Sequence, residues 1–164
     1  MCAVKAIPDG YHSITPSLVC KNAAQAIEFY KEVFQAKEKM RMTGPGGSIG
    51  HAELVIGDSP LMLSDEFPGM ATAPGANSPP SSYLFVYSDN VDALFDRAVK
   101  AGAKVEMPLQ NQFWGDRYGK IQDPFGHRWG LAQHVEEVSP AEMERRSAAW
   151  VAQMSKAAGS GGHD

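Results

Sequence analysis

Two polar side chains interrupt an apolar run in the first half of the chain. His51 and Glu53 are two residues apart in Ile-Gly-His-Ala-Glu-Leu-Val-Ile. Successive side chains of a strand point to opposite faces, so these two share one face. An imidazole beside a carboxylate can act as a base or hold a metal ion. The other interpretation is a hydrogen-bonded pair on a solvated sheet face, and the sequence leaves both open.

Charged and aromatic side chains also gather in the second half. Asp116, Tyr118 and Lys120 alternate on one predicted strand face, whereas Arg117 points to the other face. Beside Trp114, this group could hold an anionic or flat ligand by charge and stacking. Alternatively, Asp116 and Arg117 pair with their neighbours to hold the loop, and Trp114 packs on the sheet.

A soft, aromatic lining is predicted for a ligand cavity, since such side chains suit a flat organic molecule. Its members are Met62, Tyr83, Phe113 and Trp114. We expect Arg128 to face the same cavity, where a buried carboxylate such as Glu53 needs a cation or hydrogen-bond donors. Arg128 is the first predicted partner of Glu53, and His51 is the second.

The elements that position these residues repeat along the chain. Residues 18–22 align with residues 85–89 at a spacing of 67, and each stretch reads as strand, helix, strand. Asn22 is the predicted cap of the first helix, and Asp89 or Asn90 caps the second. Two further strands follow each helix, at 49–56 and 61–64 in the first half and at 116–122 and 127–133 in the second. Each half is therefore predicted to be a β-α-β-β-β unit.

The predicted fold class is α+β, with two half-barrel sheets and the helices outside. The organisation is an arm (1–12), a first unit (13–66), a flexible connector (67–82), a second unit (83–136), a C-terminal helix (137–158) and a disordered tail (159–164). One unit cannot close its own core, so two must share one, either within the chain or across a dimer. The C-terminal helix carries an apolar stripe that either covers the protein's own sheet or docks a partner. The stripe consists of Met143, Trp150, Val151 and Met154.

Composition excludes several partners. Lys and Arg number 15 against 19 Asp and Glu, a net charge of −4, which gives no basic surface for nucleic acid or an anionic membrane. No stretch approaches the length of a membrane span and the N-terminus lacks a secretory signal, so a cytoplasmic location is expected. Cys2 and Cys20 are expected to be reduced thiols.

These patterns resemble the vicinal oxygen chelate superfamily, which includes glyoxalase I, bleomycin resistance proteins and extradiol dioxygenases. The similar segments are residues 26–34, 51–58 and 123–127, and residues 114–119 resemble the PhnB-like branch. The resemblance implies a fold of paired β-α-β-β-β units. It places the four metal-ligand positions of the family at Thr15, Glu53, Tyr83 and Gly130. Only Glu53 keeps a strong ligand, which predicts no glyoxalase-type metal site.

The resulting hypothesis is a small-molecule-binding protein of the bleomycin-resistance kind. Its cavity would lie at the sheets of a homodimer and would need no cofactor, and the acidic net charge favours a cationic guest. The alternative is a metal-dependent lyase, isomerase or dioxygenase that holds a divalent ion with Glu53, His51 and further ligands. The sequence leaves open whether the protein is an enzyme.

Overall fold

The computed structural model describes residues 4–75 and 79–159. The first half contains β1 (Ser17–Cys20), α1 (Ala23–Phe34), β2 (Lys37–Thr43), the short 3-10 turn η1 (Pro45–Gly47), β3 (Ile49–Ile56) and β4 (Ser59–Asp65). The second half contains β5 (Leu84–Tyr87), α2 (Val91–Lys100), β6 (Lys104–Asn111), β7 (Asp116–Gln122) and β8 (Arg128–His134), and α3 (Pro140–Gly159) follows. The predicted repeat and the α+β fold class are confirmed, and the ends of β4, β8 and the C-terminal helix differ from the predicted bounds by one to three residues.

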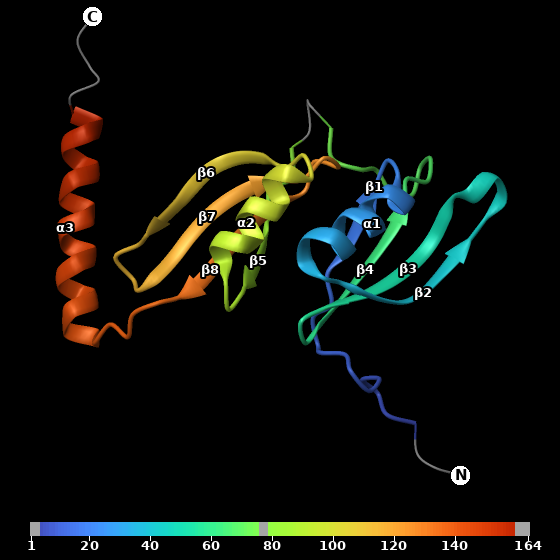
Figure 1. The fold of residues 1–164 in the computed structure, drawn as a ribbon, viewed down its shortest axis with the longest axis horizontal. Helices are drawn as coiled ribbons and strands as arrows, with labels where there is room; N and C mark the ends of the chain where they lie inside the picture. Colours follow the sequence, from blue (N-terminus) through green and yellow to red (C-terminus); the bar gives the residue numbers. More distant parts are fainter. Residues whose placement is uncertain (1–3, 76–78, 160–164) are drawn as a thin grey trace, which may run out of the picture.

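The two halves have the same sheet topology (Figure 1). The strand orders are β1-β4-β3-β2 and β5-β8-β7-β6. In each sheet the first and last strands of the unit pair in parallel and the other pairs are antiparallel. A strand and helix are therefore followed by a three-stranded meander in both units.

Local sequence signals explain where the first two helices begin and end. The side chains of Asn22 and Asn90 accept hydrogen bonds from the first turns of α1 and α2, as predicted. Gly102 follows the C-cap of α2 with φ of 101°, a left-handed conformation that glycine adopts without strain. Each helix buries one apolar stripe against its sheet.

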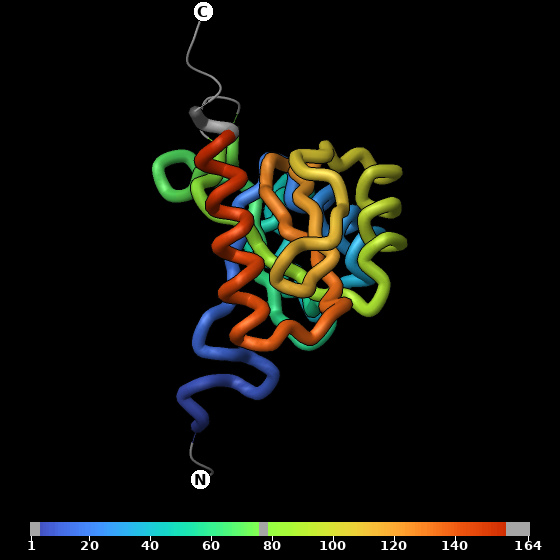
Figure 2. The backbone as a smooth tube through the Cα atoms, turned by 90° about the vertical axis from the view of Figure 1, so that its left-hand side faces the viewer, coloured from blue at the N-terminus to red at the C-terminus, as the bar shows by residue number. Residues whose placement is uncertain are grey.

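The helices join the two units into one core. Figures 1 and 2 show α1 and α2 on the same side of the paired sheets. Phe34 of α1 packs against Trp129 of β8 with ring centroids 4.5 Å apart. The buried carboxylate of Asp123 accepts hydrogen bonds from the Tyr30 hydroxyl at 2.8 Å and the Trp129 indole N–H at 2.9 Å. The core is therefore shared within the chain, on the helix side of both sheets.

The opposite side of both sheets remains open. Figure 2 shows the N-terminal arm and α3 on this side, across the sheets from α2. We call these two surfaces the open faces of the first and second sheet. Within the part of the chain that the structure describes, no helix combines the length and apolar character needed to cross a membrane.

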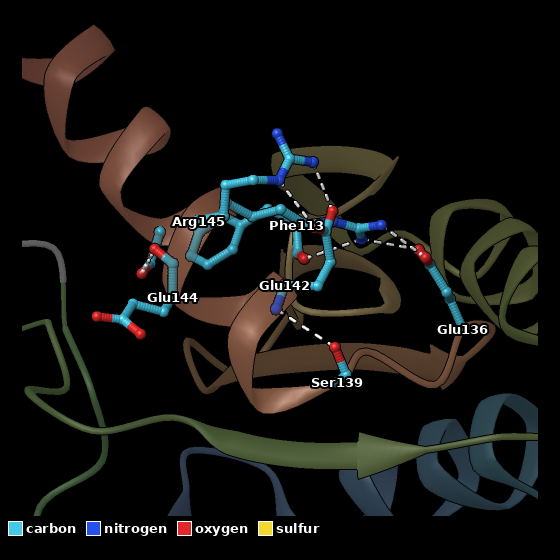
Figure 3. Close-up of polar contacts among 8 residues, drawn as sticks. Phe113, Glu136, Ser139, Glu142, Glu144 and Arg145 are labelled. Carbon is cyan, nitrogen blue, oxygen red and sulfur yellow. Dashed lines mark hydrogen bonds and ion pairs between the residues drawn. The ribbon is translucent and has the colours of Figure 1, made fainter.

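The C-terminal helix is held mainly by polar contacts in its first turns (Figure 3). Ser139 caps it by accepting the Glu142 N–H at 3.3 Å, so the helix begins three residues after the predicted bound at 137. Arg146 binds Glu136 at 2.7 Å and donates to the Phe113 carbonyl at 3.3 Å. These contacts fix α3 beside the turn between β6 and β7.

Of the two alternatives for the α3 stripe, packing on the protein's own sheet is not found for much of the helix. Trp150 packs against Phe113 with ring centroids 5.7 Å apart, but it remains half exposed. Val151 and Met154 are each 54% exposed, because the helix runs past the end of the second sheet.

Cys20 is a free, buried thiol, and burial raises its pKa to about 12, so it is not a ready nucleophile. The predictions for Cys2 and for the tail at 160–164 lie outside the described residues.

Candidate functional site

The strand pair His51 and Glu53 lies on the open face of the first sheet. His51 Nε2 is 3.3 Å from Glu53 Oε1, so the predicted proximity is found. The hydroxyl of Tyr11 donates a hydrogen bond to Glu53 Oε2. This bond from Tyr11, followed by the contact with His51, holds the pKa of Glu53 below its usual value. The N-terminal arm thus supplies a donor that satisfies the carboxylate.

The prediction that Arg128 pairs with Glu53 is wrong within the chain. Arg128 Nε instead lies 2.9 Å from Glu106 Oε1, across the second sheet. Glu53 belongs to the first sheet and Arg128 to the second. The two sheets share a core on their helix side, and their open faces do not face each other. Tyr11 takes the place that the sequence analysis assigned to Arg128.

Four aromatic side chains form a layer on the open face of the second sheet, which we call the aromatic platform. Its members are Tyr83, Phe85, Tyr87 and Tyr118. Phe85 and Tyr118 stack with ring centroids 5.2 Å apart and an interplanar angle of 6°. Tyr83, Phe85 and Tyr87 are 48%, 42% and 63% exposed, respectively. Large aromatic surface is thus presented to solvent in one place, which is typical of a binding surface.

Gly130 provides the space for this stack. A Cβ atom at Gly130 would lie 2.9 Å from a ring carbon of Tyr118 and 3.1 Å from a ring carbon of Phe85. Both distances are shorter than normal van der Waals contact. The platform therefore occupies the volume that any longer side chain at this position would need.

The carboxylate of Asp116 lies under one end of the platform and is only 4% exposed. Its Oδ2 accepts from the Tyr87 hydroxyl at 3.0 Å and from the Trp114 indole N–H at 3.1 Å. Its Oδ1 lies 2.9 Å from His134 Nδ1. Three donors from separate segments satisfy this buried charge. Asp116 therefore organises its neighbours, as one of the two sequence interpretations proposed.

Arg117 faces the helix layer, as its place in the strand predicted. Its guanidinium group lies 2.6 Å from the carboxylate of Asp92 in α2. This ion pair ties the helix to the sheet, and Arg117 does not contribute to the open face. Phe113 and Trp114 stand at the turn between β6 and β7, where Trp114 contacts Tyr118 with centroids 5.9 Å apart.

The ten predicted site residues thus form two groups rather than one cavity. Met62 is the cross-strand neighbour of Glu53 and belongs to the first sheet. The aromatic and charged residues of the second half belong to the second sheet. Cavities of about 1120 Å³ and about 880 Å³ lie between elements of the chain, and none of the ten predicted residues lines either of them.

Four residues at these two groups were missed by the sequence analysis. Phe85 and Tyr87 could have been found, because Tyr83, Phe85 and Tyr87 alternate on one strand face. Tyr11 and His134 carry no such signal. Their partners are far away in sequence, and only the fold brings them together.

The residues do not fit the four-ligand metal site that the family implies. Of the four matching positions, Gly130 offers no donor and its space is filled by aromatic rings. Thr15 and Tyr83 carry hydroxyls, which are weak ligands for transition metals. Within 4–75 and 79–159, no three His, Cys, Asp or Glu side chains are grouped so that they could hold a metal ion.

The sequence of the chain is similar to that of known proteins. The sequence model of the Glyoxalase/Bleomycin resistance protein/Dioxygenase superfamily matches residues 10–131. The uncharacterized protein Rv0887c from Mycobacterium tuberculosis is 42% identical over 138 residues, which cover 80% of this chain and 80% of that protein.

Two solved structures share the architecture. TioX from Micromonospora sp. ML1 aligns with a TM-score of 0.61 at 26% identity, covering 76% of this chain and 99% of TioX. A glutamate-to-glutamine mutant of the fosfomycin resistance protein FosX from Listeria monocytogenes, complexed with Mn(II) and 1S,2S-dihydroxypropylphosphonic acid, aligns with a TM-score of 0.58 at 16% identity. That alignment covers 83% of this chain and 96% of FosX. The chain therefore belongs to the glyoxalase/bleomycin resistance protein/dioxygenase superfamily.

Proposed function

We propose that this protein binds a flat organic molecule on the aromatic platform of the second sheet. The observation that carries the proposal is the exposure of Tyr83, Phe85 and Tyr87, at 48%, 42% and 63%, on one continuous face. A flat ligand would remove this apolar surface from water and stack on rings that are already ordered. A preformed surface of this kind costs little conformational entropy on binding.

The local charge favours an anionic group on that ligand. Lys120 Nζ lies 4.6 Å from the centroid of the Tyr83 ring. Among the described residues Lys120 has no carboxylate within ion-pair distance. The ammonium group is therefore available to a ligand carboxylate or phenolate. This local charge outweighs the net charge of −4 from which a cationic guest was expected, because salt screens distant surface charges.

A homodimer would enclose this ligand. The open face of the first sheet also exposes apolar side chains, with Met40 at 39% and Met42 at 59%. The N-terminal arm and α3 lie on the same side and carry further exposed apolar groups. A second copy that brings its first sheet over the platform would bury both surfaces. Sedimentation equilibrium should then give a dimer at micromolar concentration, and a monomer would contradict the shared cavity.

Fluorescence titration tests the binding proposal. Naphthalene-2-carboxylate is the probe, and its uncharged methyl ester is the matched control ligand. We expect saturable binding of the carboxylate, weaker binding of the ester, and loss of that difference in Lys120→Met. Equal binding of both ligands to the wild-type protein would contradict the role of Lys120, and no saturable binding of either would contradict the proposed function.

Metal analysis provides an independent check on the alternative of a metal-dependent enzyme. In Glu53 both carboxylate oxygens already have partners, namely Tyr11 and His51. We expect protein purified without chelators to contain no stoichiometric divalent metal. Stoichiometric metal that is lost in Glu53→Gln would overturn this expectation.

A further inference from the structure

We propose that His134, oriented by Asp116, is a proton acceptor for the hydroxyl group of a phenol or enol bound on the aromatic platform. This inference rests on the proposed function and names the chemical class of its ligand. His134 ends β8, next to the first residue of β7. It therefore stands at one end of the strand face on which Tyr118 and Lys120 alternate.

The orientation of the imidazole follows from its contact with Asp116. Asp116 Oδ1 lies 2.9 Å from His134 Nδ1. An ionised carboxylate only accepts hydrogen bonds, so Nδ1 carries the proton of the neutral imidazole and donates it. Nε2 of the neutral imidazole then keeps its lone pair and is the basic atom, and the exposed carboxylate of Glu137 lies 3.4 Å from it. A carboxylate that fixes the tautomer of a histidine in this way is a recurrent feature of general bases.

The carboxylate itself is held rigidly. The Tyr87 hydroxyl and the Trp114 indole both donate to its other oxygen, at 3.0 and 3.1 Å. Asp116 is 4% exposed, whereas the His134 side chain is 48% exposed. The pair therefore combines a buried, fixed carboxylate with an imidazole that a ligand can reach. A structural histidine would more commonly be covered, and a solvated surface pair would not involve a carboxylate that is 4% exposed and has two further donors.

The charged groups around His134 favour proton uptake. The hydrogen bond from Nδ1 to Asp116 raises the pKa of His134 above its usual value, with a further contribution from Glu137. Glu137 lies 3.4 Å from Nε2 but is 97% exposed, so a ligand hydroxyl can displace it at little cost. Tyr87 faces Asp116 rather than the imidazole, and Glu136 is paired with Arg146.

The proton transfer is balanced within the site. The ligand O–H bond breaks, its proton moves to His134 Nε2, and the electron pair remains on the ligand oxygen. The resulting phenolate or enolate lies beside an imidazolium, whose charge Asp116 offsets. No oxidant, reductant or further reactant is needed. The ring of the ligand would lie on Phe85 and Tyr118, with its hydroxyl directed to the His134 end of the platform.

The test compares 4-nitrophenol, whose ionised form absorbs visible light, with 4-nitroanisole, which has no ionisable proton. Equilibrium dialysis measures binding of both ligands, and absorbance measures ionisation of the bound phenol. We expect the apparent pKa of bound 4-nitrophenol to be lower than in solution by about one unit, a tenfold change in the ionised ratio. His134→Gln should abolish that shift, because it removes the basic nitrogen at an exposed position. Lys100→Gln, at an exposed position of α2 on the helix side of the sheets, is the control and should retain it.

The outcomes separate this inference from the proposed function. If both ligands bind but 4-nitrophenol is ionised to the same extent in wild type and His134→Gln, the proton-acceptor role is wrong and the platform stands. If neither ligand binds, the platform itself fails and this inference fails with it. As a second readout, NMR titration of His134 should show a midpoint that falls in Asp116→Asn, and an unchanged midpoint would contradict the orienting role of Asp116.

Discussion

Substitution of Gly130 by alanine tests how the aromatic platform is built. The added Cβ would lie 2.9 Å from Tyr118 and 3.1 Å from Phe85, so at least one ring must move. Overpacking of this kind costs about 1–3 kcal/mol. Glycine in a strand is itself less favourable than alanine by about 0.5–1 kcal/mol, which acts in the opposite direction. The clash is the larger effect, and we expect Gly130→Ala to lower the free energy of unfolding by up to about 2.5 kcal/mol.

Thermal unfolding measured by circular dichroism provides the assay. For a chain of this length, each kcal/mol changes the Tm by about 2–4 °C, so a decrease of up to roughly 10 °C is expected. Gly50 of β3 is the matched control, because a Cβ there would meet only the Met42 carbonyl oxygen at 3.7 Å, an ordinary contact. Gly50→Ala should therefore leave the Tm unchanged or raise it. A Tm that rises to the same extent in both variants would refute the argument that Gly130 makes room for the stack.

Two further predictions concern the buried carboxylate of Asp123 and the imidazole of His134. Asp123→Ala leaves the Tyr30 hydroxyl and the Trp129 indole without an acceptor in the shared core, and urea denaturation should show a loss of about 2–6 kcal/mol. Tyr30→Phe, which removes the donor together with the bond, should cost much less, and an equal cost would contradict this explanation. Because the folded-state pKa of His134 is raised, its contribution to stability is fully present below about pH 6.5 and is lost as the pH rises through the folded value. The stability difference between wild type and His134→Gln should therefore shrink between acidic and alkaline pH, and a difference that grows with pH would show that the sign is wrong.

The repeat and its elements could be predicted because local chemistry determines them. Asn22 and Asn90 cap their helices through side chains that act within one turn. The alternation of His51 and Glu53 predicted a shared face because strand periodicity is independent of the rest of the fold. These features need no knowledge of which segments meet in space.

The side-chain partners that come from different strands could not be predicted, because their contacts depend on which segments meet in space. The contact of His134 with Asp116 depends on the register between β7 and β8, which the sequence does not specify. The predicted pairing of Arg128 with Glu53 is wrong because the two side chains lie on the open faces of two different sheets, which do not form one common cavity. Nothing in the local sequence indicates that Tyr11 of the N-terminal arm reaches Glu53, 42 residues further along the chain.

Binding of a flat aromatic ligand to the platform is the central claim, and Phe85→Ala tests it most directly by isothermal titration with naphthalene-2-carboxylate. Phe85 is 42% exposed, so its removal should leave the fold intact. Loss of one stacking partner costs about 0.5–1.5 kcal/mol, which corresponds to a Kd roughly 2- to 13-fold weaker. Val99→Ala, which removes an equally exposed apolar side chain from α2 on the helix side, should leave the Kd unchanged. Equal Kd values for wild type, Phe85→Ala and Val99→Ala would contradict the account.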